Sequence, residues 1–149
     1  TYETLRGARI DDVGGILELL SPLEANGTLV RRSRELLENE IQRFVIIERD
    51  GMVIACAALY PFAEDKTGEL ACVVVHPGYR SGERGLQMLR HLERRAREQG
   101  LASLFVLTTH TAHWFQENGF QAADIKALPA QRQQLYNWQR NSKVFVKRL

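Results

Sequence analysis

The chain has 149 residues, of which 44% are hydrophobic and 26% charged, and these proportions fit one folded domain with a normal core. Its 20 basic and 18 acidic residues nearly balance, so it lacks the positive field that holds nucleic acid. No uncharged stretch approaches the roughly 18 residues that span a bilayer, and the first residues do not form a signal-peptide pattern. We therefore expect one cytoplasmic domain over residues 1–149, with neither nucleic acid nor a membrane as partner.

The chain begins with Thr1 instead of Met, so we expect it to be part of a longer protein, cut at a domain boundary. Its two cysteines, Cys56 and Cys72, both lie inside apolar runs. A small buried side chain is the ordinary explanation at such positions. The sequence therefore predicts neither a disulfide nor a metal site.

The first part of the chain predicts a strand and two helices. Residues 4–10 have the mixed pattern of a half-exposed strand, and Asp11 or Asp12 offers an N-cap for the next helix. Ser33 is a good N-cap for a second helix that extends to Ile41. The first helix has an apolar stripe and should end at Ser21-Pro22; the stripe consists of Val13, Ile16, Leu17 and Leu20.

The middle of the chain predicts a hairpin followed by a buried strand. Residues 44–49 and 52–60 flank Asp50-Gly51, a pair that supplies the positive φ angles of a tight primed turn. Pro61 should end the second strand of this hairpin. Residues 69–75 are apolar on both faces, so we expect them to form the central strand.

The rest of the chain predicts a long helix over residues 85–99, ended by Gly100. Leu86, Leu89, Leu92 and Ala96 should face inward. The remaining elements are a strand at 104–107, a short helix ending at Gly119, extended residues 120–123, a partly helical segment within 130–142, and a strand at 144–147 that closes the sheet. The predicted fold class is α/β, with a mixed central sheet and helices on both faces.

The turn after residue 75 carries the first chemical signal. A helix N-terminus leaves amide N–H groups unpaired, so a turn rich in arginine and glycine can wrap a pyrophosphate. An ordinary strand-to-helix turn is an equally good interpretation of this segment alone. The candidate residues are Arg80, Ser81, Gly82, Arg84 and Gly85.

Two motifs favour the first interpretation. Residues 75–80, followed by Gly85 and a leucine-striped helix, resemble motif A of the GNAT acetyltransferases, which holds the pyrophosphate of coenzyme A. Residues 114–120 resemble the end of motif B in that superfamily. The resemblance implies the GNAT fold and acetyl-CoA as co-substrate. Two positions depart from the motifs: Glu83 replaces the first glycine of motif A, and Phe115 replaces the tyrosine that protonates the leaving thiolate in many members.

Blocks outside these motifs are similar to the acetyltransferase domain of bacterial N-acetylglutamate synthases, the amino-acid N-acetyltransferases. These blocks are residues 29–34, 55–61, 68–73, 105–109 with 113–115, and 135–143. The resemblance implies transfer of the acetyl group from acetyl-CoA to the α-amine of L-glutamate, the entry to arginine biosynthesis. It also implies a preceding amino-acid-kinase-like domain in the parent chain and leaves a homo-oligomer open.

Glutamate carries two carboxylates, and guanidinium groups bind carboxylates through paired charge-assisted hydrogen bonds. The resemblance assigns this role to Arg32 and Arg140, with Lys143 as a further possibility. Without it, each of these cations would be ordinary solvated surface.

The amine of glutamate must lose a proton before it attacks the thioester, and the resemblance gives this base role to Glu69. Backbone groups of Cys72, Val73 and Val75 would hold the pantetheine arm and stabilise the oxyanion. Thr108 is the candidate acid through a bound water, with Thr109, His110 and His113 as weaker ones. Because a thiol has a pKa near 8.5, a strong acid is not obligatory.

Two alternatives stay open. One is a GNAT enzyme that acetylates another small amine. The other, prompted by Glu83 and Phe115, is a module that binds acetyl-CoA as a sensor without turnover.

Overall fold

The computed structural model of the chain describes residues 2–136 and 141–149. Its contacts divide into two compact units, one of residues 1–59 with 72–92 and the other of residues 60–71 with 93–149. Ladder pairing places the strands in one seven-stranded mixed sheet, in the order β1-β2-β3-β4-β5-β7-β6. The α/β class and the central position of β4 are thus as the sequence predicts.

The first unit is built on an antiparallel ladder. β1 (Glu3–Gly7) pairs with β2 (Phe44–Arg49), which pairs with β3 (Met52–Phe62). Asp50 and Gly51 join β2 to β3 with φ angles of 49° and 85°, which confirms the primed turn. Buried aliphatic and aromatic side chains of β2 and β3 form the core on these strands: Phe44, Ile46, Ile47, Ile54 and Leu59.

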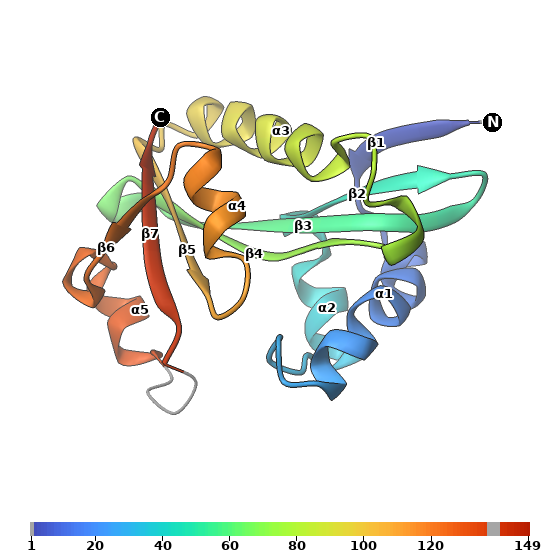
Figure 1. Cartoon of the computed structure of the whole chain (residues 1–149), viewed down its shortest axis with the longest axis horizontal. Helices are drawn as coiled ribbons and strands as arrows, with labels where there is room; N and C mark the ends of the chain where they lie inside the picture. The colour runs from blue at the N-terminus through green and yellow to red at the C-terminus, as the bar shows by residue number, and fades with distance from the viewer. Residues whose placement is uncertain (1, 137–140) are drawn as a thin grey trace. The chain divides into compact units, whose positions relative to one another are not determined.

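The helices of the first unit cover both sides of its strands (Figure 1). α1 (Val13–Ala25) and α2 (Arg34–Glu40) contact each other on one side, and α3 (Arg84–Glu98) begins on the other. Short 3₁₀ turns at Ile10–Asp12 and Ile41–Arg43 precede α1 and follow α2. The Ser33 hydroxyl accepts a hydrogen bond from Leu36 N, so Ser33 caps α2 as predicted.

Asp12 occupies the N-cap position of α1, as predicted, but its side chain accepts no capping hydrogen bond from that helix. The Asp12 carboxylate instead binds the Arg6 guanidinium at 2.8 and 3.0 Å and accepts a hydrogen bond from Arg9 N. Arg6 therefore lowers the pKa of Asp12 below its usual range. The Asp12 carboxylate therefore binds Arg6 of β1 instead of the amide groups at the start of α1.

The sequence also places two proline boundaries wrongly. α1 continues through Pro22 to Ala25. Proline removes one N–H donor from the helix, but the Pro22 carbonyl still accepts a hydrogen bond from Asn26 N. β3 continues through Pro61 to Phe62. The ladder with β2 ends at the pair of Phe44 and Ala58, so Pro61 removes no hydrogen bond from it.

β4 (Thr67–Val75) follows β3 through a 3₁₀ turn at Ala63–Asp65, and another at Pro77–Tyr79 leads toward α3. Leu70, Cys72 and Val74 of β4 are buried, but the alternate residues keep part of their surface accessible. The prediction of a strand buried on both faces is thus correct for alternate residues only. In α3 the inward residues are Met88, Leu89, Leu92 and Ala96, whereas Leu86 is half-exposed.

The second unit contains a parallel and two antiparallel pairings. The first part of β4 is parallel to β5 (Ser103–Thr108), β5 is antiparallel to β7 (Lys143–Arg148), and β7 is antiparallel to β6 (Gln121–Ala123). The last strand thus lies between β5 and β6 and does not close the sheet at its edge. The connecting elements are α4 (Ala112–Glu117), a 3₁₀ turn at Ile125–Ala127 and α5 (Ala130–Gln134).

A buried ion pair links α3 to β7. The Lys147 Nζ atom lies 2.6 Å from Glu93 Oε2 and 2.9 Å from the carbonyl oxygen of Asn118, which follows α4. The Glu93 side chain is only 3% exposed. Since this carboxylate is almost out of water, its partner is needed to offset the cost of burying the charge.

We expect Glu93→Gln to lower the free energy of unfolding by about 3 kcal/mol, because the Lys147 ammonium then stays buried without its carboxylate. Glu98→Gln, at an exposed position of the same helix, should change it by less than about 0.5 kcal/mol. Urea unfolding followed by circular dichroism measures both values. Equal losses in the two variants would contradict a stabilising role for the pair.

Candidate functional site

The segment after β4 is fixed by short-range hydrogen bonds. His76 N donates to Ile54 O at 2.7 Å, which attaches the end of β4 to β3. The His76 ring then accepts a hydrogen bond from Gly78 N through Nδ1, and Pro77 occupies the first position of the 3₁₀ turn. Tyr79 N donates to His76 O and closes this turn. The backbone therefore reaches residues 80–84 in a defined direction.

Both residues before α3 have left-handed backbone conformations. Gly82 has φ 94° and Glu83 has φ 59°. A Cβ added to Gly82 would also lie 3.3 Å from Arg84 Nη1, so only glycine suits this position. Glu83 thus has a left-handed conformation at the position where motif A has its first glycine, and its carbonyl accepts the hydrogen bond from Gln87 N at the start of the helix. Its side chain is exposed.

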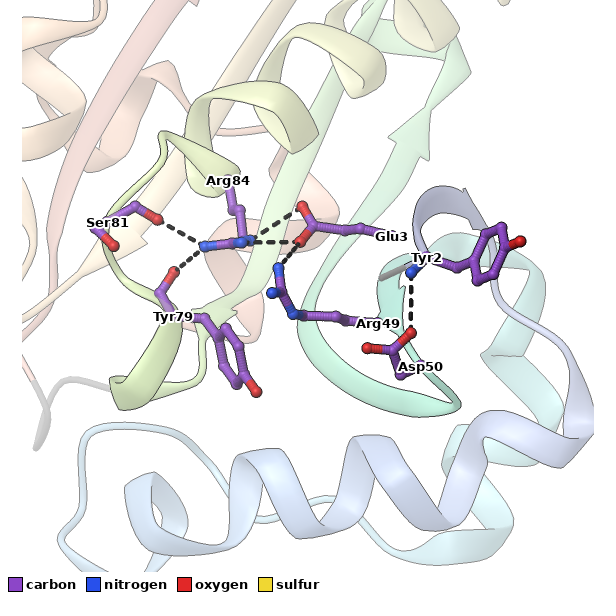
Figure 2. Close-up of polar contacts among 7 residues, drawn as sticks. All are labelled: Tyr2, Glu3, Arg49, Asp50, Tyr79, Ser81 and Arg84. Carbon is purple, nitrogen blue, oxygen red and sulfur yellow. Dashed lines mark hydrogen bonds and ion pairs between the residues drawn. The ribbon is translucent and has the colours of Figure 1, made fainter.

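The two arginines of the turn differ in their surroundings, and Figure 2 shows those of Arg84. The guanidinium of Arg84 donates to both Glu3 carboxylate oxygens and to the carbonyl oxygens of Tyr79 and Ser81. Arg80 is exposed, and no ion pair joins it to another residue of the described part of the chain. Arg80 is therefore the arginine whose charge is available to an anion at the turn.

β4 carries a local break in its strand geometry. Cys72 has φ 53°, and its carbonyl accepts a hydrogen bond from the Cys56 thiol at 3.3 Å. Burial raises the pKa of that thiol, which keeps it a neutral donor. The ladder with β5 ends at the pair of Leu70 and Val106, two residues before the break. Val73 and Val75 follow it and are partly accessible.

The carboxylate of Glu69 is held by an arginine that the sequence did not indicate. Arg132, in α5, donates from Nε to Glu69 Oε1 at 2.7 Å and from Nη2 to Oε2 at 3.3 Å. The side chain of Glu69 is 13% exposed and that of Arg132 is 21% exposed. The pair satisfies a carboxylate that would otherwise be costly inside a strand.

Thr108 and Lys143 are opposite each other in the ladder between β5 and β7. The Thr108 hydroxyl lies 2.8 Å from the Thr111 hydroxyl and accepts a hydrogen bond from Thr111 N, so it belongs to the turn before α4. Phe115, which replaces the usual tyrosine, is buried and packs edge-on against the rings of Trp114 and Phe120.

The loop before α2 places Arg32. Its backbone N–H donates to Glu24 Oε2 at 2.8 Å, so α1 fixes the start of the second helix, and its side chain is half-buried. Arg140, the other predicted carboxylate ligand, lies outside the described residues. The side chain of His113, a weaker candidate acid, is 88% exposed and pairs with Glu117 one helical turn away.

The predicted site residues fall in both units. Those of the donor turn belong to the first unit with Arg32 and the end of β4, whereas Glu69, Thr108 and Lys143 belong to the second. Sequence reasoning missed Arg132 and Glu3, which act on predicted residues across 63 and 81 positions of sequence. The one signal in the sequence is Glu69 itself: a carboxylate in a buried strand needs a partner, which indicates a cation elsewhere in the chain.

Within residues 2–136 and 141–149, no group of three or more acidic, histidine or cysteine side chains is placed to hold a metal ion. No helix of this part of the chain is both long and apolar enough to cross a membrane.

A turn at the start of a helix, next to an exposed arginine, is an arrangement that suits a phosphate-containing ligand. The model of the acetyltransferase (GNAT) family matches residues 15–120, and the chain belongs to this family.

Two proteins show where it lies within the family. The amino-acid acetyltransferase of Ectopseudomonas mendocina is 61% identical over 148 residues, which cover 99% of this chain and 34% of that protein. N-acetylglutamate synthase from Neisseria gonorrhoeae, solved with coenzyme A and N-acetyl-glutamate, is 43% identical with a TM-score of 0.95. That match covers 100% of this chain and 35% of the synthase. The chain therefore spans about a third of the length of these relatives.

We expect Glu83→Gly to raise the free energy of unfolding by about 0.5–1 kcal/mol, because glycine removes the strain of a left-handed residue with a Cβ. Glu83→Ala keeps that strain and should give no gain. Thermal and urea unfolding of both variants measure the difference. A similar gain in the two variants would show that charge, and not backbone strain, determines the effect.

Proposed function

We propose that this domain transfers the acetyl group of acetyl-CoA to the α-amine of L-glutamate, giving N-acetyl-L-glutamate and CoA. The observation that carries the proposal is the match over the whole chain to a synthase solved with coenzyme A and N-acetyl-glutamate. We infer further that the parent chain contains an amino-acid-kinase-like domain before this one, since the relatives are about three times longer. A cytoplasmic location and a homo-oligomer stay predictions.

The donor would bind through the first unit. Amide groups of the turn before α3, including those of Ser81 and Gly82, together with the exposed charge of Arg80, suit a pyrophosphate. Gly85 follows within the first turn of the helix, where side chains would crowd an anion. Backbone groups of Val73 and Val75 lie beyond the end of the β4–β5 ladder and are the candidates for the pantetheine arm.

The acceptor has two carboxylates and one amine to be recognised. Arg32 and Arg140 are the proposed carboxylate ligands, and Lys143 at the start of β7 is a further cation. Lys143 is exposed and is the ladder partner of Thr108. This set favours a dicarboxylic amino acid over other small amines.

Glu69 would accept the proton from the amine, directly or through water. A carboxylate has about four lone-pair sites, and Arg132 occupies two of them, so acceptor capacity remains. The amine nitrogen then forms the new bond to the acetyl carbon. The C–S bond breaks after the tetrahedral intermediate, whose oxyanion a backbone N–H of β4 would stabilise. The CoA thiolate leaves and takes a proton from water positioned by Thr108.

A sensing module without turnover is the second candidate, and the burial of Phe115 is the observation that favours it. Phe115 cannot donate a proton, and its side chain is buried against the rings of Trp114 and Phe120. A thiolate with a pKa near 8.5 leaves without a strong acid, however, so the enzyme proposal does not depend on residue 115. Thiol release from acetyl-CoA on addition of glutamate separates the two candidates.

We expect Glu69→Gln to lower kcat at least about 100-fold while CoA binds with unchanged affinity, because only proton removal from the amine is lost. Free-thiol assays and calorimetric CoA titration measure the two quantities. Glu64→Gln, which removes an exposed carboxylate near the start of β4, is the matched control and should be as active as the parent. An unchanged rate for Glu69→Gln would exclude Glu69 as the base.

Arg32→Ala and Arg140→Ala should each raise the KM for glutamate at least about tenfold, since each removes a charge-assisted pair with a carboxylate. Arg31→Ala, next to Arg32 but exposed, should leave this KM within about twofold. Initial rates with glutamate and with glutamine complete the test. Equal rates with the two amino acids would contradict recognition of a second carboxylate.

A further inference from the structure

Arg84 makes four hydrogen bonds within the first unit (Figure 2). Nε and Nη2 donate to the two oxygens of Glu3 at 3.1 and 2.8 Å, in the paired geometry that guanidinium and carboxylate favour. Nη1 donates to the carbonyl oxygens of Tyr79 at 2.9 Å and Ser81 at 2.7 Å. The side chain is 13% exposed. Its charge therefore faces a carboxylate and two carbonyl dipoles.

The two carbonyl contacts orient the turn. The peptide bonds of this turn are trans, and in a trans peptide the C=O and the following N–H point in opposite directions. The carbonyls of Tyr79 and Ser81 point to the Arg84 guanidinium. The N–H groups of Arg80 and Gly82 consequently point away from it, as a pair of donors with the same general direction.

Glu3 is itself held in place from β1 and β2. Its Oε1 atom also accepts a hydrogen bond from Arg49 Nη1 at 3.0 Å, and Arg49 is its partner in the β1–β2 ladder. The hydrogen bonds from Arg84 and Arg49 lower the pKa of Glu3, so it stays ionised. The Tyr79 ring lies 5.4 Å from the guanidinium carbons of both Arg49 and Arg84, which adds cation–π attraction to the cluster.

The start of β1 is attached to the same hairpin. Tyr2 N donates to Asp50 Oδ1 at 2.9 Å, and Asp50 N donates to Tyr2 O at 2.9 Å. This pair of hydrogen bonds closes the end of the ladder next to Glu3. Glu3, whose carboxylate binds Arg84, thus follows a residue that is hydrogen-bonded to the hairpin turn.

We propose that Glu3 and Arg84 are positioning residues for the acetyl-CoA pyrophosphate: Glu3 holds Arg84, and Arg84 aims the N–H groups of Arg80 and Gly82 at the anion without contacting it. This inference rests on the proposed donor. It replaces the direct charge contact expected of Arg84 from the sequence by an indirect one, and it gives a residue of β1, outside the acetyltransferase motifs, a part in donor binding.

Positioning and direct contact predict opposite signs for one substitution. If Arg84 binds the pyrophosphate directly, Glu3→Gln releases the guanidinium, removes a negative charge and tightens CoA binding. If Arg84 orients the turn, the same substitution lets the turn relax and weakens binding. We expect Glu3→Gln to raise the CoA dissociation constant and the KM for acetyl-CoA by roughly tenfold. The KM for glutamate should change little.

S-acetylpantetheine, which ends before the pyrophosphate, separates positioning from general structural damage. With this donor, Glu3→Gln and the unsubstituted protein should have rates within about twofold, because the oriented amides have no ligand in either protein. Glu48→Gln is the matched control: it removes a carboxylate paired with Arg6 on the neighbouring strand and should leave both donors unaffected. Arg84→Lys, which keeps the charge but not the fork of donors, should reproduce the loss seen for Glu3→Gln.

Calorimetric CoA titration and rates with the two donors decide the matter. Unchanged or tighter CoA binding in Glu3→Gln overturns the proposal, and so does an equal loss with both donors. If Glu3→Gln does not fold, Arg84→Lys serves as the same test, and unaltered CoA affinity in that variant is a negative result. Failure of the proposed function would give a different result from failure of this inference. The unsubstituted protein would then bind no CoA or release no thiol with glutamate.

Discussion

The left-handed conformation of Cys72 within β4 is the constraint on which the site depends. A strand normally continues its ladder on both sides, but the pairing with β5 ends at Leu70 and the strand changes geometry two residues later. The Cys56 thiol satisfies the carbonyl at the break, so the distortion leaves that group hydrogen-bonded in the interior. The backbone of residues 73–75 and the turn after it can then serve a ligand.

The two units supply different chemistry. The first offers oriented amides, an exposed arginine and the half-buried Arg32, and these groups suit anions. The second offers the carboxylate of Glu69, held by Arg132, and the hydroxyl of Thr108, and these groups suit proton transfer. An arginine–carboxylate pair sets the geometry in each unit, between Arg84 and Glu3 in one and between Arg132 and Glu69 in the other.

The elements that could be predicted are those with local causes. Asp50-Gly51 determined the hairpin, Ser33 determined the start of α2, and Gly100, with φ 80°, ended the long helix. Local rules failed where distant contacts decide. The sequence predicts that Pro22 and Pro61 end their elements, but neither does. The Pro22 carbonyl still accepts a hydrogen bond from Asn26 N, and Pro61 lies beyond the last pair of the β2–β3 ladder.

For the candidate site, too, the sequence predicts the residues with local signals and not their distant partners. The motif positions and Glu69 follow from sequence blocks and from the cost of a charge in a strand. The partners of these residues did not, because Glu3 and Arg132 lie in segments whose own pattern indicates only a strand and a polar helix. An ion pair between residues 63 or 81 positions apart leaves no periodic trace in the chain.

The position of β7 between β5 and β6 has a consequence for biosynthesis. β5 is complete at Thr108, yet its antiparallel neighbour begins only at Lys143, and β6 enters the sheet through β7 alone among the described strands. A ribosome takes on the order of a few seconds to add the intervening residues. During that interval the nascent chain exposes an open strand edge rich in apolar side chains, which is a template for wrong pairing. Chaperone binding to the half-made second unit would have its greatest value in that interval.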